Sequence, residues 1–572
     1  MKLRSTFLLG MLFLCFSPSI LLADVSSRDN AGSEQSRLER DKIFKEQEKS
    51  AEAQKTPEIK MTEKEEPPAA PSGETFVIKE VKFLGNLSIP SKELEPFVQD
   101  LIGRPITLSE IDAAVSKIKE HYRSKGFVAV YAFVPAQQIL TGTLKIDIME
   151  GRVGEVKITG ERRWFGQDML KKMFRMKPGE ILTYNGLRRD LAVLGKNRDL
   201  EPKAVLEPGS QPGTTNAVVE VKEKFPFHIS GDINNSGSKN TGLERYGLTA
   251  EHTNVTGHMD DLTTTVQYGR DSLALGAAYA VPVIPQWGTT LGYSFSYTDI
   301  DVKGPFAPLL VSGDAMSHSV DIFQPIMETE DWNITWKFGF DSKSIQNYLL
   351  GLPSTRDELR ILNTGLNFEE SDEKGKTFSS HEFAYGIPNF LGSSDKVEIE
   401  ASRLGTGAQF FVYRGSLTRF QKISDDILVT LRTSVQSSKD ALPPSEQISI
   451  GGSKTVRGYQ EGEYLGDTGG YLAMDAYFPL YFLPEAWQLP GASESVRKQF
   501  QAVVFADYGY AELVSPLAGE KKNRDLAGVG VGLRAHLYDK FYGRVEYAFP
   551  VGDRALDNRN GAFYFTVSCE FF

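Results

Sequence analysis

The segment GAFYFTVSCEFF, from Gly561 to Phe572, places an apolar side chain at every second position. The alternating apolar residues are Phe563, Phe565, Val567, Cys569 and Phe571. A period of two is typical of a β-strand whose two faces meet different surroundings. An unpaired apolar edge promotes aggregation in a soluble sheet, whereas a closed membrane barrel has no such edge. The segment therefore favours an outer-membrane barrel over a soluble enzyme. Phe572 itself falls in register with Ser568 and Glu570, which leaves the register of the final residues open.

The same alternation recurs through residues 225–572, where helical patterns nearly vanish. In one stretch Leu291, Tyr293, Phe295 and Tyr297 alternate with small polar residues and glycine. One face of such a strand suits lipid and the other suits water. A soluble β-sandwich or propeller also alternates, and is the competing interpretation. At about 20 residues per strand and loop, the span predicts a transmembrane β-barrel of roughly 16 antiparallel strands.

The first residues have the order of a secretory signal. Lys2 and Arg4 precede an apolar stretch over residues 7–22, and the small Ala23 follows. We expect a cleaved signal peptide over residues 1–23. The alternatives are an N-terminal membrane anchor, for which the stretch is short, and a lipoprotein site at Cys15, for which Leu14 is bulky.

Composition narrows the possible functions further. Cleavage of the signal would leave Cys569 as the single cysteine, so we expect no internal disulfide. After residue 23 no apolar run is long enough for a helical membrane span. The net charge of −11 argues against nucleic acid as a partner.

Residues 24–73 form a separate region. From Ser36 to Lys55 the sequence suits a solvated helix, because Asp41 and Lys45 lie at i,i+4, Glu39 and Lys42 lie at i,i+3, and there is almost no apolar stripe. Residues 56–71 contain four prolines and predict an extended linker. From these residues alone a disordered tail is the favoured interpretation, and the helix with its linker is the alternative that the family resemblance described below supports.

An internal repeat lies between Phe76 and Glu223. Val81 matches Val156, and Gly85 matches Gly160, each 75 positions further on. Each copy reads as a strand, two helices and two strands, with helical apolar spacing and glycine at helix ends. We therefore predict two small α+β modules in series, over residues 74–151 and 152–224.

No arrangement typical of an enzyme is present. The chain has no nucleophile elbow, zinc-binding helix motif or phosphate loop, and its seven histidines are scattered. We assign no catalytic residue, no metal and no cofactor.

The most informative internal stretch is a glycine-rich loop, near residues 442–474, that carries Val456, Arg457, Gly458 and Tyr459. Fifty positions after Arg457, the strand QAVVFADYG places Phe505, Asp507 and Gly509 on one face. A charge facing lipid is expensive, so we place Asp507 in the lumen. The next strand, GVGVGLR, has Gly528, Gly530 and Gly532 at alternate positions, where a loop can lie close to the wall.

The ordered set VRGY, FADYG and GVGVGLR, behind tandem β-α-α-β-β modules, resembles the POTRA-plus-barrel superfamily of outer-membrane protein transporters. Within it the chain is similar to the two-partner secretion transporters (TpsB), the haemolysin secretion/activation family ShlB/FhaC/HecB. The stretches from Phe133 to Gly160 and from Ile233 to Glu251 support this assignment. The resemblance covers the chain from about Phe76 to Phe572.

The resemblance implies two periplasmic POTRA domains, a 16-stranded barrel, and a loop that folds into the lumen so that Arg457 pairs with Asp507. A guanidinium suits this role because it stays charged and binds a carboxylate through two hydrogen bonds. Loss of one partner would cost about 3–5 kcal/mol in a dry site. The resemblance also implies that the N-terminal helix plugs the pore. A barrel of this size has an aqueous channel that needs an obstruction.

The function that follows is an outer-membrane translocator for one large, β-rich, TpsA-like secreted polypeptide, with its POTRA domains in the bacterial periplasm. POTRA modules would recruit this partner by adding its strand to a sheet edge. The candidate contact region contains Ser109, Ile111, Phe127 and Phe133. We further expect contact with outer-membrane lipid, insertion by the barrel-assembly machinery and action as a monomer. A barrel-protein insertase and a passive porin are the alternatives.

Overall fold

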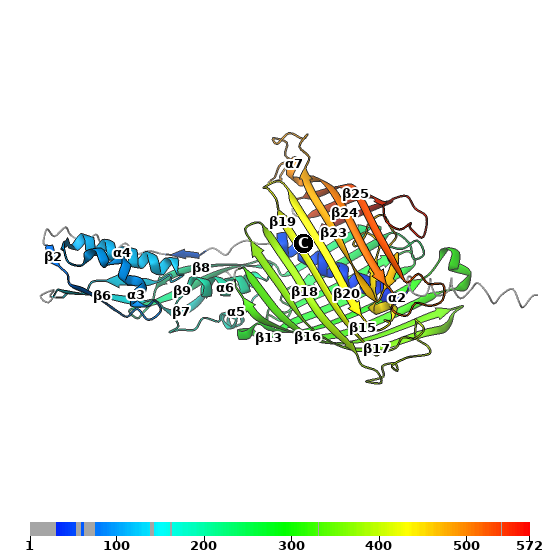
Figure 1. The fold of residues 1–572 in the computed structure, drawn as a ribbon, viewed down its shortest axis with the longest axis horizontal. Coiled ribbons are helices and arrows are strands. Elements are labelled where there is room, and N and C mark those ends of the chain that lie inside the picture. Colours follow the sequence, from blue (N-terminus) through cyan, green and yellow to red (C-terminus); the bar gives the residue numbers. More distant parts are fainter. Residues whose placement is uncertain are drawn as a thin grey trace, which may run out of the picture.

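The computed structural model describes residues 30–52, 59–61, 75–137, 142–160, 163–329, 331–492, 494–538 and 540–572. The predicted signal peptide, residues 1–23, lies outside these ranges. Figure 1 shows two small modules in a row at one end of the molecule, a large barrel at the other, and one helix inside the barrel. Among the described residues, no helix has the length and apolar character needed to cross a membrane.

The C-terminal part of the chain is a closed barrel in which every neighbouring pair of strands is antiparallel. Its 16 strands follow chain order around the wall, and the first pairs with the last. The strands are β10 (Phe227–Asn234), β11 (Arg245–His252), β12 (Asp261–Gly269), β13 (Ser272–Ile284), β14 (Thr289–Asp301), β15 (Ser312–Glu328), β16 (Trp332–Leu349), β17 (Leu352–Asp372), β18 (Gly375–Gly386), β19 (Phe410–Lys422), β20 (Leu428–Ser438), β23 (Thr468–Pro479), β24 (Phe500–Glu512), β25 (Asn523–Leu537), β26 (Phe541–Pro550) and β27 (Ala562–Glu570). The expected 16-stranded barrel is thereby confirmed, and the sandwich and propeller alternatives are excluded.

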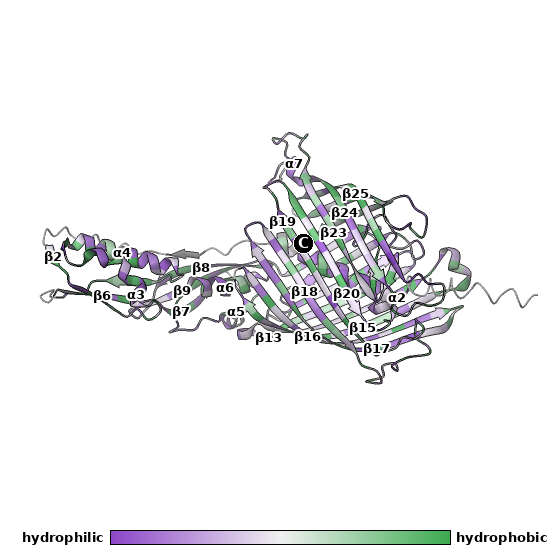
Figure 2. Ribbon diagram, viewed as in Figure 1, coloured by the Kyte–Doolittle hydropathy of each residue, from purple (hydrophilic) through white to green (hydrophobic). Residues whose placement is uncertain are grey.

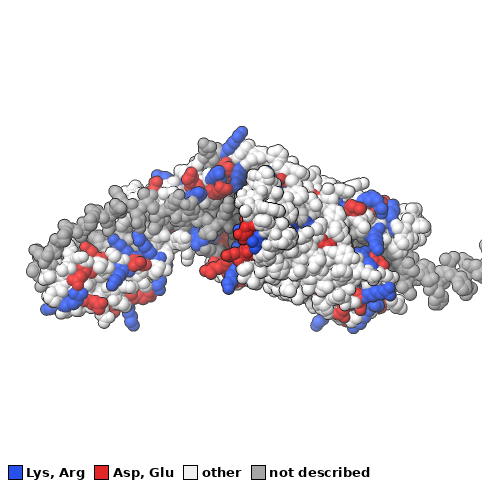
Figure 3. All heavy atoms as spheres, turned by 90° about the horizontal axis from the view of Figure 1, so that it is seen from above, with Lys and Arg blue, Asp and Glu red and all other residues white. Residues whose placement is uncertain are grey.

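Alternation of side chains explains why these segments form a membrane wall. Leu472 and Met474 on β23 are exposed on the outside, whereas Ala473 and Asp475, which alternate with them, are buried. Figure 2 shows hydrophobic and hydrophilic residues alternating along the barrel strands. On the face shown in Figure 3, charged side chains lie on the modules and toward the two ends of the barrel, and they are sparse along the middle of the barrel. An uncharged outer band with a polar interior is the pattern of a barrel in lipid.

The last strand, β27, closes the barrel against β10 and ends at Glu570. Phe563, Val567 and Phe571 are exposed on the outside, in register with one another, while Tyr564 is buried on the inner side. The backbone N–H of Phe571 donates to the carbonyl of Ile229 at 2.8 Å, which extends the seam beyond the strand. Phe572 lies beyond the end of β27. Its position in the alternation therefore leaves the outward-facing residues Phe563, Val567 and Phe571 unaffected.

The first module contains a three-stranded sheet, covered by one long helix. Its elements are β2 (Thr75–Val77), β3 (Glu80–Leu84), α3 (Ser91–Leu94), β4 (Pro105–Thr107), α4 (Leu108–Ser124), β5 (Val130–Phe133) and β6 (Thr143–Glu150). The sheet order is β3-β6-β5, and β2 pairs with β4. Helix α4 begins with a capping box in which Thr107 and Glu110 satisfy each other's backbone N–H groups.

The first helix of this module is shorter than the sequence predicts. The repeat predicts a full helix after β3, but only α3 is α-helical, and two 3₁₀ turns follow, η1 (Glu95–Phe97) and η2 (Gln99–Leu101). Pro96 lacks the N–H that a continuous α-helix requires, so the chain tightens into i→i+3 bonds.

The second module has the expected order of a strand, two helices and two strands. Its elements are β7 (Arg152–Thr159), α5 (Gln167–Met173), α6 (Tyr184–Gly195), β8 (Leu200–Pro208) and β9 (Thr214–Glu223). The sheet gains a fourth, parallel strand on β8 from the linker, β1 (Ile59–Met61), in the order β1-β8-β9-β7.

The second module is fixed to the periplasmic rim of the barrel by charged side chains. Lys196 and Arg175 both contact Glu328 at the end of β15, with Lys196 Nζ 2.6 Å from Glu328 Oε1. Arg198 bridges Glu251 on β11 and Glu570 on β27. Because Arg198 reaches both sides of β10, this module spans the seam between the first and last strands.

Candidate functional site in the barrel lumen

The segment between β20 and β23 folds into the barrel. It contains a short hairpin of β21 (Ile448–Ile450) and β22 (Tyr464–Gly466), which pair with each other. Between them, Val456, Arg457 and Tyr459 are completely buried. We call residues 439–467 the inward loop. The bound of 474 expected from the sequence falls within β23, which begins at Thr468.

Arg457 and Asp507, singled out from the sequence, are in direct contact. Arg457 Nη2 and Nε lie 2.7 Å from Asp507 Oδ1 and Oδ2, respectively. The backbone N–H of Arg457 also donates to Asp507 Oδ2 at 2.9 Å. The wall carboxylate therefore binds both the guanidinium and the backbone of the loop, which fixes the loop tip in position and in orientation.

Two further carboxylates complete this site, and sequence reasoning missed both. Arg457 Nη1 lies 2.6 Å from Asp475 Oδ1 on β23 and 2.9 Å from Glu546 Oε1 on β26. Arg432 and Arg544 in turn pair with Asp475. Three guanidinium groups thus face three carboxylates, so the buried charges balance. The available signal was the inward register of Asp475 and Glu546 in their strands.

Phe505, two residues before Asp507 on β24, lies under the Arg457 guanidinium. The Cζ atom of Arg457 is 3.5 Å from the centre of the Phe505 ring, a cation–π contact. A Cβ on the nearby Gly509 would come within 2.7 Å of Val456, so the loop lies directly on this strand. Phe505 and Gly509 therefore receive the loop tip on either side of Asp507.

The alternating glycines of β25 allow close approach of the loop and of neighbouring side chains. A Cβ on Gly528 would lie 1.9 Å from the carbonyl oxygen of Arg457, a distance no folded structure tolerates. At Gly530 an added Cβ would meet Phe505, and at Gly532 it would meet Glu546. Gly458 has φ of +101° and sits against the backbone of Pro550, which restricts this turn to glycine.

The loop tip is also attached to the strand that closes the barrel. Tyr564 of β27 accepts a hydrogen bond from the N–H of Gly458 at 3.0 Å and donates to the carbonyl of Tyr459 at 2.7 Å. The hydroxyl of Tyr459 donates to the carbonyl of Asp553 at 2.9 Å. Residues of the VRGY motif therefore connect β24, β25 and β27.

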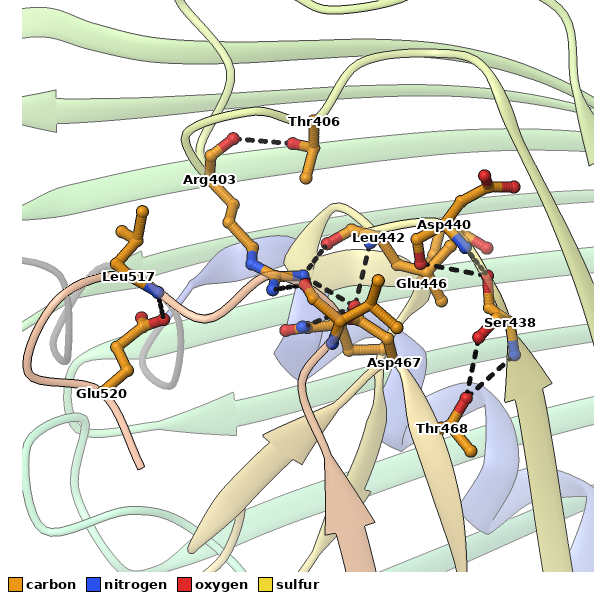
Figure 4. A network of polar contacts seen from close by, with 12 residues as sticks. Arg403, Thr406, Ser438, Asp440, Leu442, Glu446, Asp467, Thr468, Leu517 and Glu520 are labelled. Carbon is orange, nitrogen blue, oxygen red and sulfur yellow. Dashed lines mark hydrogen bonds and ion pairs between the residues drawn. The ribbon is translucent and has the colours of Figure 1, made fainter. Parts of the chain in front are cut away.

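The base of the inward loop is held by a second hub, centred on the buried Asp467. This carboxylate accepts from Arg403 at 2.7 Å, from the Leu442 N–H at 2.9 Å and from the Val514 N–H at 2.7 Å. Figure 4 shows Arg403 reaching Asp467 and Leu442 from the β18–β19 connection. Three connections at the same end of the barrel therefore meet at one carboxylate.

The helix α2 (Ala31–Glu52) lies inside the barrel (Figure 1). It begins five residues before the start expected from the sequence, because Asn30 caps it by accepting the Gly32 N–H at 2.8 Å. The first turn is buried: Ala31 is fully enclosed among apolar residues such as Ile345 of the wall and Leu442 of the inward loop. An added Cβ on Gly32 would come within 2.9 Å of Ser445. The helix N-terminus is therefore fitted closely into the wall and the inward loop.

Further along, polar and aromatic contacts hold α2 to the wall. Ser36 Oγ donates to the Ser445 carbonyl at 2.7 Å, and Glu34 lies 3.6 Å from the buried Arg245. Phe44 stacks on Phe420 and lies under Arg432, with 4.6 Å between Arg432 Cζ and the ring centre. Most other contacts are single ion pairs or hydrogen bonds at partly exposed side chains, which contribute little stability each.

A large cavity remains beside α2. Its volume is approximately 2790 Å³, and the exposed side of α2 lines it together with inward residues of most barrel strands. Arg188, Lys196 and Arg198 of the second module line the same cavity. By contrast, residues 30–35 at the other end of the helix are buried. The cavity therefore continues to the periplasmic module, and the buried helix end lies at the opposite, extracellular side.

The four residues suggested for partner binding differ in their exposure to solvent. Ser109 and Phe133 are exposed on the first module, and Phe127 is half-buried against Tyr122, with 5.4 Å between ring centres. Ile111 is 1% exposed and belongs to the core of this module, so it cannot contact a partner. The helical spacing that singled out Ile111 is the spacing of its core face. Tyr122 lies in that core too, where burial and the nearby Glu150 carboxylate raise the pKa of its hydroxyl.

Within the described residues, no group of three or more His, Cys, Asp or Glu side chains is arranged to hold a metal ion. The buried carboxylates around the loop tip instead pair with guanidinium groups. This arrangement holds a loop and a helix inside a wide polar channel.

A closed 16-stranded barrel with an internal loop, preceded by two α+β modules, defines an outer-membrane transporter of the POTRA-plus-barrel class. Residues 213–535, more than half of the chain, match the family described as haemolysin secretion/activation protein ShlB/FhaC/HecB. Residues 76–151 match the ShlB-type POTRA domain. The chain therefore belongs to the ShlB/FhaC/HecB family, and it lies in the bacterial outer membrane with its POTRA domains in the periplasm.

Named relatives are similar over most of their length. The chain is 23% identical to the outer membrane transporter CdiB of Dickeya dadantii (strain 3937), over 73% of this chain and 74% of that protein. It is 22% identical to the heme/hemopexin transporter protein HuxB of Haemophilus influenzae (strain Rd), over 81% of each chain. Among solved structures, CdiB from Escherichia coli is similar with a TM-score of 0.73, 20% identity, and coverage of 94% of this chain and 98% of that one.

We predict that Gly528→Ala destabilises the barrel, because its methyl group would overlap the backbone of the inward loop at Arg457. Overpacking of this kind costs about 1–3 kcal/mol. The measurement is the temperature at which the detergent-solubilised barrel loses its compact electrophoretic form. Gly543→Ala on the neighbouring β26 is the matched control, since its nearest neighbour would lie at 3.5 Å. Equal midpoints for the two variants would contradict the close approach described here.

We predict that Phe44→Ala weakens the seating of α2 and raises the mean conductance of the barrel in planar bilayers. The substitution removes the ring that stacks on Phe420 and lies under Arg432. Ile43→Ala is the control, because Ile43 is 54% exposed and lines the cavity. If both variants conduct like the unmodified protein, the Phe44 contacts do not hold the helix.

Proposed function

We propose that this chain exports a large, β-rich, TpsA-like polypeptide, which enters from the periplasm and crosses the outer membrane through the lumen after α2 has left it. The single observation that carries this proposal is the helix inside the channel. It blocks a barrel that is otherwise wide enough for an extended chain. Beyond the first turn, its contacts are scattered ion pairs at partly exposed side chains and the Phe44 contacts. The inward loop, in contrast, is bound through buried ion pairs and stays in place.

Recruitment of the partner is proposed to use the free edge of the first POTRA module. In the sheet order β3-β6-β5, strand β5 has a neighbour on one side within the described residues. Tyr131 and Phe133 on this strand are 42% and 43% exposed. An extended polypeptide can add to such an edge through main-chain hydrogen bonds, while apolar side chains beside it provide selectivity.

The linker strand β1 connects recruitment to the release of the helix. Lys60 pairs with Val205 on β8, so the chain itself covers this edge of the second POTRA sheet. A partner strand that adds to β8 must first displace β1. Because β1 follows α2 in the chain, displacement removes a restraint on the helix.

The energy for transport is proposed to come from the partner, which folds outside the cell and cannot return. The chain carries no nucleotide-binding motif.

Depletion of the protein should stop export of one partner, whereas general loss of outer-membrane barrels would favour the insertase alternative. A porin would cause neither defect. Action as a monomer and insertion by the barrel-assembly machinery stay predictions.

A photo-crosslinking side chain in place of Phe133 should capture the exported polypeptide in cells during secretion. The same group in place of Lys117, exposed on the outer face of α4, is the control and should capture much less. Equal capture at both positions, or none at Phe133, would rule out recruitment at the β5 edge.

A disulfide between Lys60→Cys and Val205→Cys, in a Cys569→Ser background, should reduce export severalfold under oxidising conditions. The bond would keep β1 on β8, and reduction should restore export. The matched control is Val205→Cys with Val218→Cys, which joins β8 to β9 inside the same sheet. Full export by the oxidised linker pair would show that β1 need not leave.

A further inference from the structure

The connection between β23 and β24, residues 480–499, is unlike the other connections on its side of the barrel. Strand β10 begins at the periplasmic module and the strands alternate in direction, so β23 ends on the periplasmic side. The other periplasmic connections are short, such as 373–374 between β17 and β18 and 538–540 between β25 and β26. Periplasmic turns in outer-membrane barrels are generally short. An extended one therefore requires an explanation.

This connection, which we call the aromatic turn, has a defined structure in its described part. Val496 N–H donates to the Trp487 carbonyl at 2.7 Å, and Gln488 forms a β-bridge with Ser495. The short helix α7 (Val496–Gln499) leads into β24. Tyr538, in the next periplasmic turn, donates to the Pro490 carbonyl at 3.1 Å and so holds the aromatic turn to the barrel rim.

Its outer surface consists of large aromatic side chains. Phe482 is 80% exposed, Trp487 57% and Tyr481 53%. The charges beside them are neutralised within the turn. Arg497 pairs with Glu485 at 2.8 Å and lies over the Tyr481 ring, 4.7 Å from its centre. The turn therefore presents apolar rings on a fixed backbone.

The position of the turn indicates what covers these rings. Figure 1 shows the turn with α7 standing out from the barrel body, beyond the end of β23. The strand face that leads to it is the lipid-facing band, with Leu472 and Met474 on β23 and Val504 on β24. The band thus continues past the strand ends into the aromatic turn.

The tryptophans of the barrel lie, like the aromatic turn, on its periplasmic side. All four are exposed in the structure and lie at the periplasmic ends of strands or in periplasmic turns: Trp287, Trp332, Trp336 and Trp487. The fifth tryptophan of the chain, Trp164, belongs to the second POTRA module. Tryptophan and tyrosine concentrate where a barrel passes the lipid headgroups. Trp487 therefore extends a girdle at the periplasmic surface of the membrane.

We propose that the aromatic turn is a membrane-binding element, which inserts Tyr481, Phe482 and Trp487 into the headgroup region of the periplasmic leaflet. Its occupant is phospholipid. The turn would act as a lateral support that fixes the barrel rim, and with it the attached POTRA modules, relative to the membrane plane. This role does not depend on the identity of any exported protein.

The test uses a full-length variant in which Trp487 is the single tryptophan, with Trp164, Trp287, Trp332 and Trp336 replaced by phenylalanine. The protein is reconstituted into vesicles of phosphatidylcholine and phosphatidylglycerol, with or without bromine on the acyl chains near the glycerol. We expect bromine to quench most of the Trp487 fluorescence, and acrylamide in the water to quench it weakly. A second variant with a Tyr131→Trp substitution and phenylalanine in place of all five natural tryptophans should show the reverse, because Tyr131 lies in the distal POTRA module.

The proposal is overturned if brominated lipid does not quench Trp487 and acrylamide quenches it as strongly as it quenches the Tyr131→Trp control. A periplasmic protein would then be the occupant of the aromatic turn. If the four replacements prevent folding, Phe482→Cys in a Cys569→Ser background, labelled with an environment-sensitive dye, gives the same comparison. The control carries the same dye on Tyr131→Cys, which faces water. If the dye on Phe482→Cys in vesicles gives the same spectrum as the dye on this control, membrane insertion is contradicted.

Discussion

The interior of this barrel depends on the neutralisation of one buried charge. The Arg457 guanidinium is removed from water and is bound by Asp507, Asp475 and Glu546, while Phe505 covers one of its faces. A guanidinium without these partners could not stay in this position, because an uncompensated buried charge costs several kcal/mol. A direct exchange of Arg457 and Asp507 would place the new aspartate beside two further carboxylates. The unit that holds the loop is therefore the whole network and not one pair.

The loop and the helix occupy the same lumen but are held in different ways. The inward loop is bound through buried ion pairs, glycine contacts and the Asp467 hub, on several strands at once. Helix α2 rests on this loop at Ser445 and is closely packed only in its first turn. The loop thus forms the seat on which the helix rests. Under the proposed function, this difference would let the helix leave while the loop that shapes the channel stays in place.

The sequence predicted the barrel well because its signal is periodic and repeated. Alternation in segments such as 291–298 requires only the strand period and the contrast between lipid and water. The contact of Arg457 with Asp507 came from an ordered set of motifs that resembles a known family. Asp475 and Glu546 carried no such motif, and alternation alone does not tell which inward residues of distant strands meet. Their roles appear only once the strand order and register are known.

The remaining differences have local causes. The start of α2 depends on a cap at Asn30 and on burial in a wall formed by distant strands, and neither leaves an amphipathic pattern in the helix. Pro96 changes one short helix into 3₁₀ turns. Ile111 followed the helical spacing that singles out core residues, and it proved to be core.

The short connection between α2 and β1 limits how far the helix can travel. Glu52 and Ile59 are seven peptide steps apart, which span at most about 25 Å, whereas the 22-residue helix is about 33 Å long. While β1 stays on β8, a helix that slips from its seat is kept near the mouth of the barrel. Confinement of this kind corresponds to a local concentration on the order of millimolar. Return of a helix tethered in this way to its seat is therefore an intramolecular event, independent of how many copies of the protein the membrane holds.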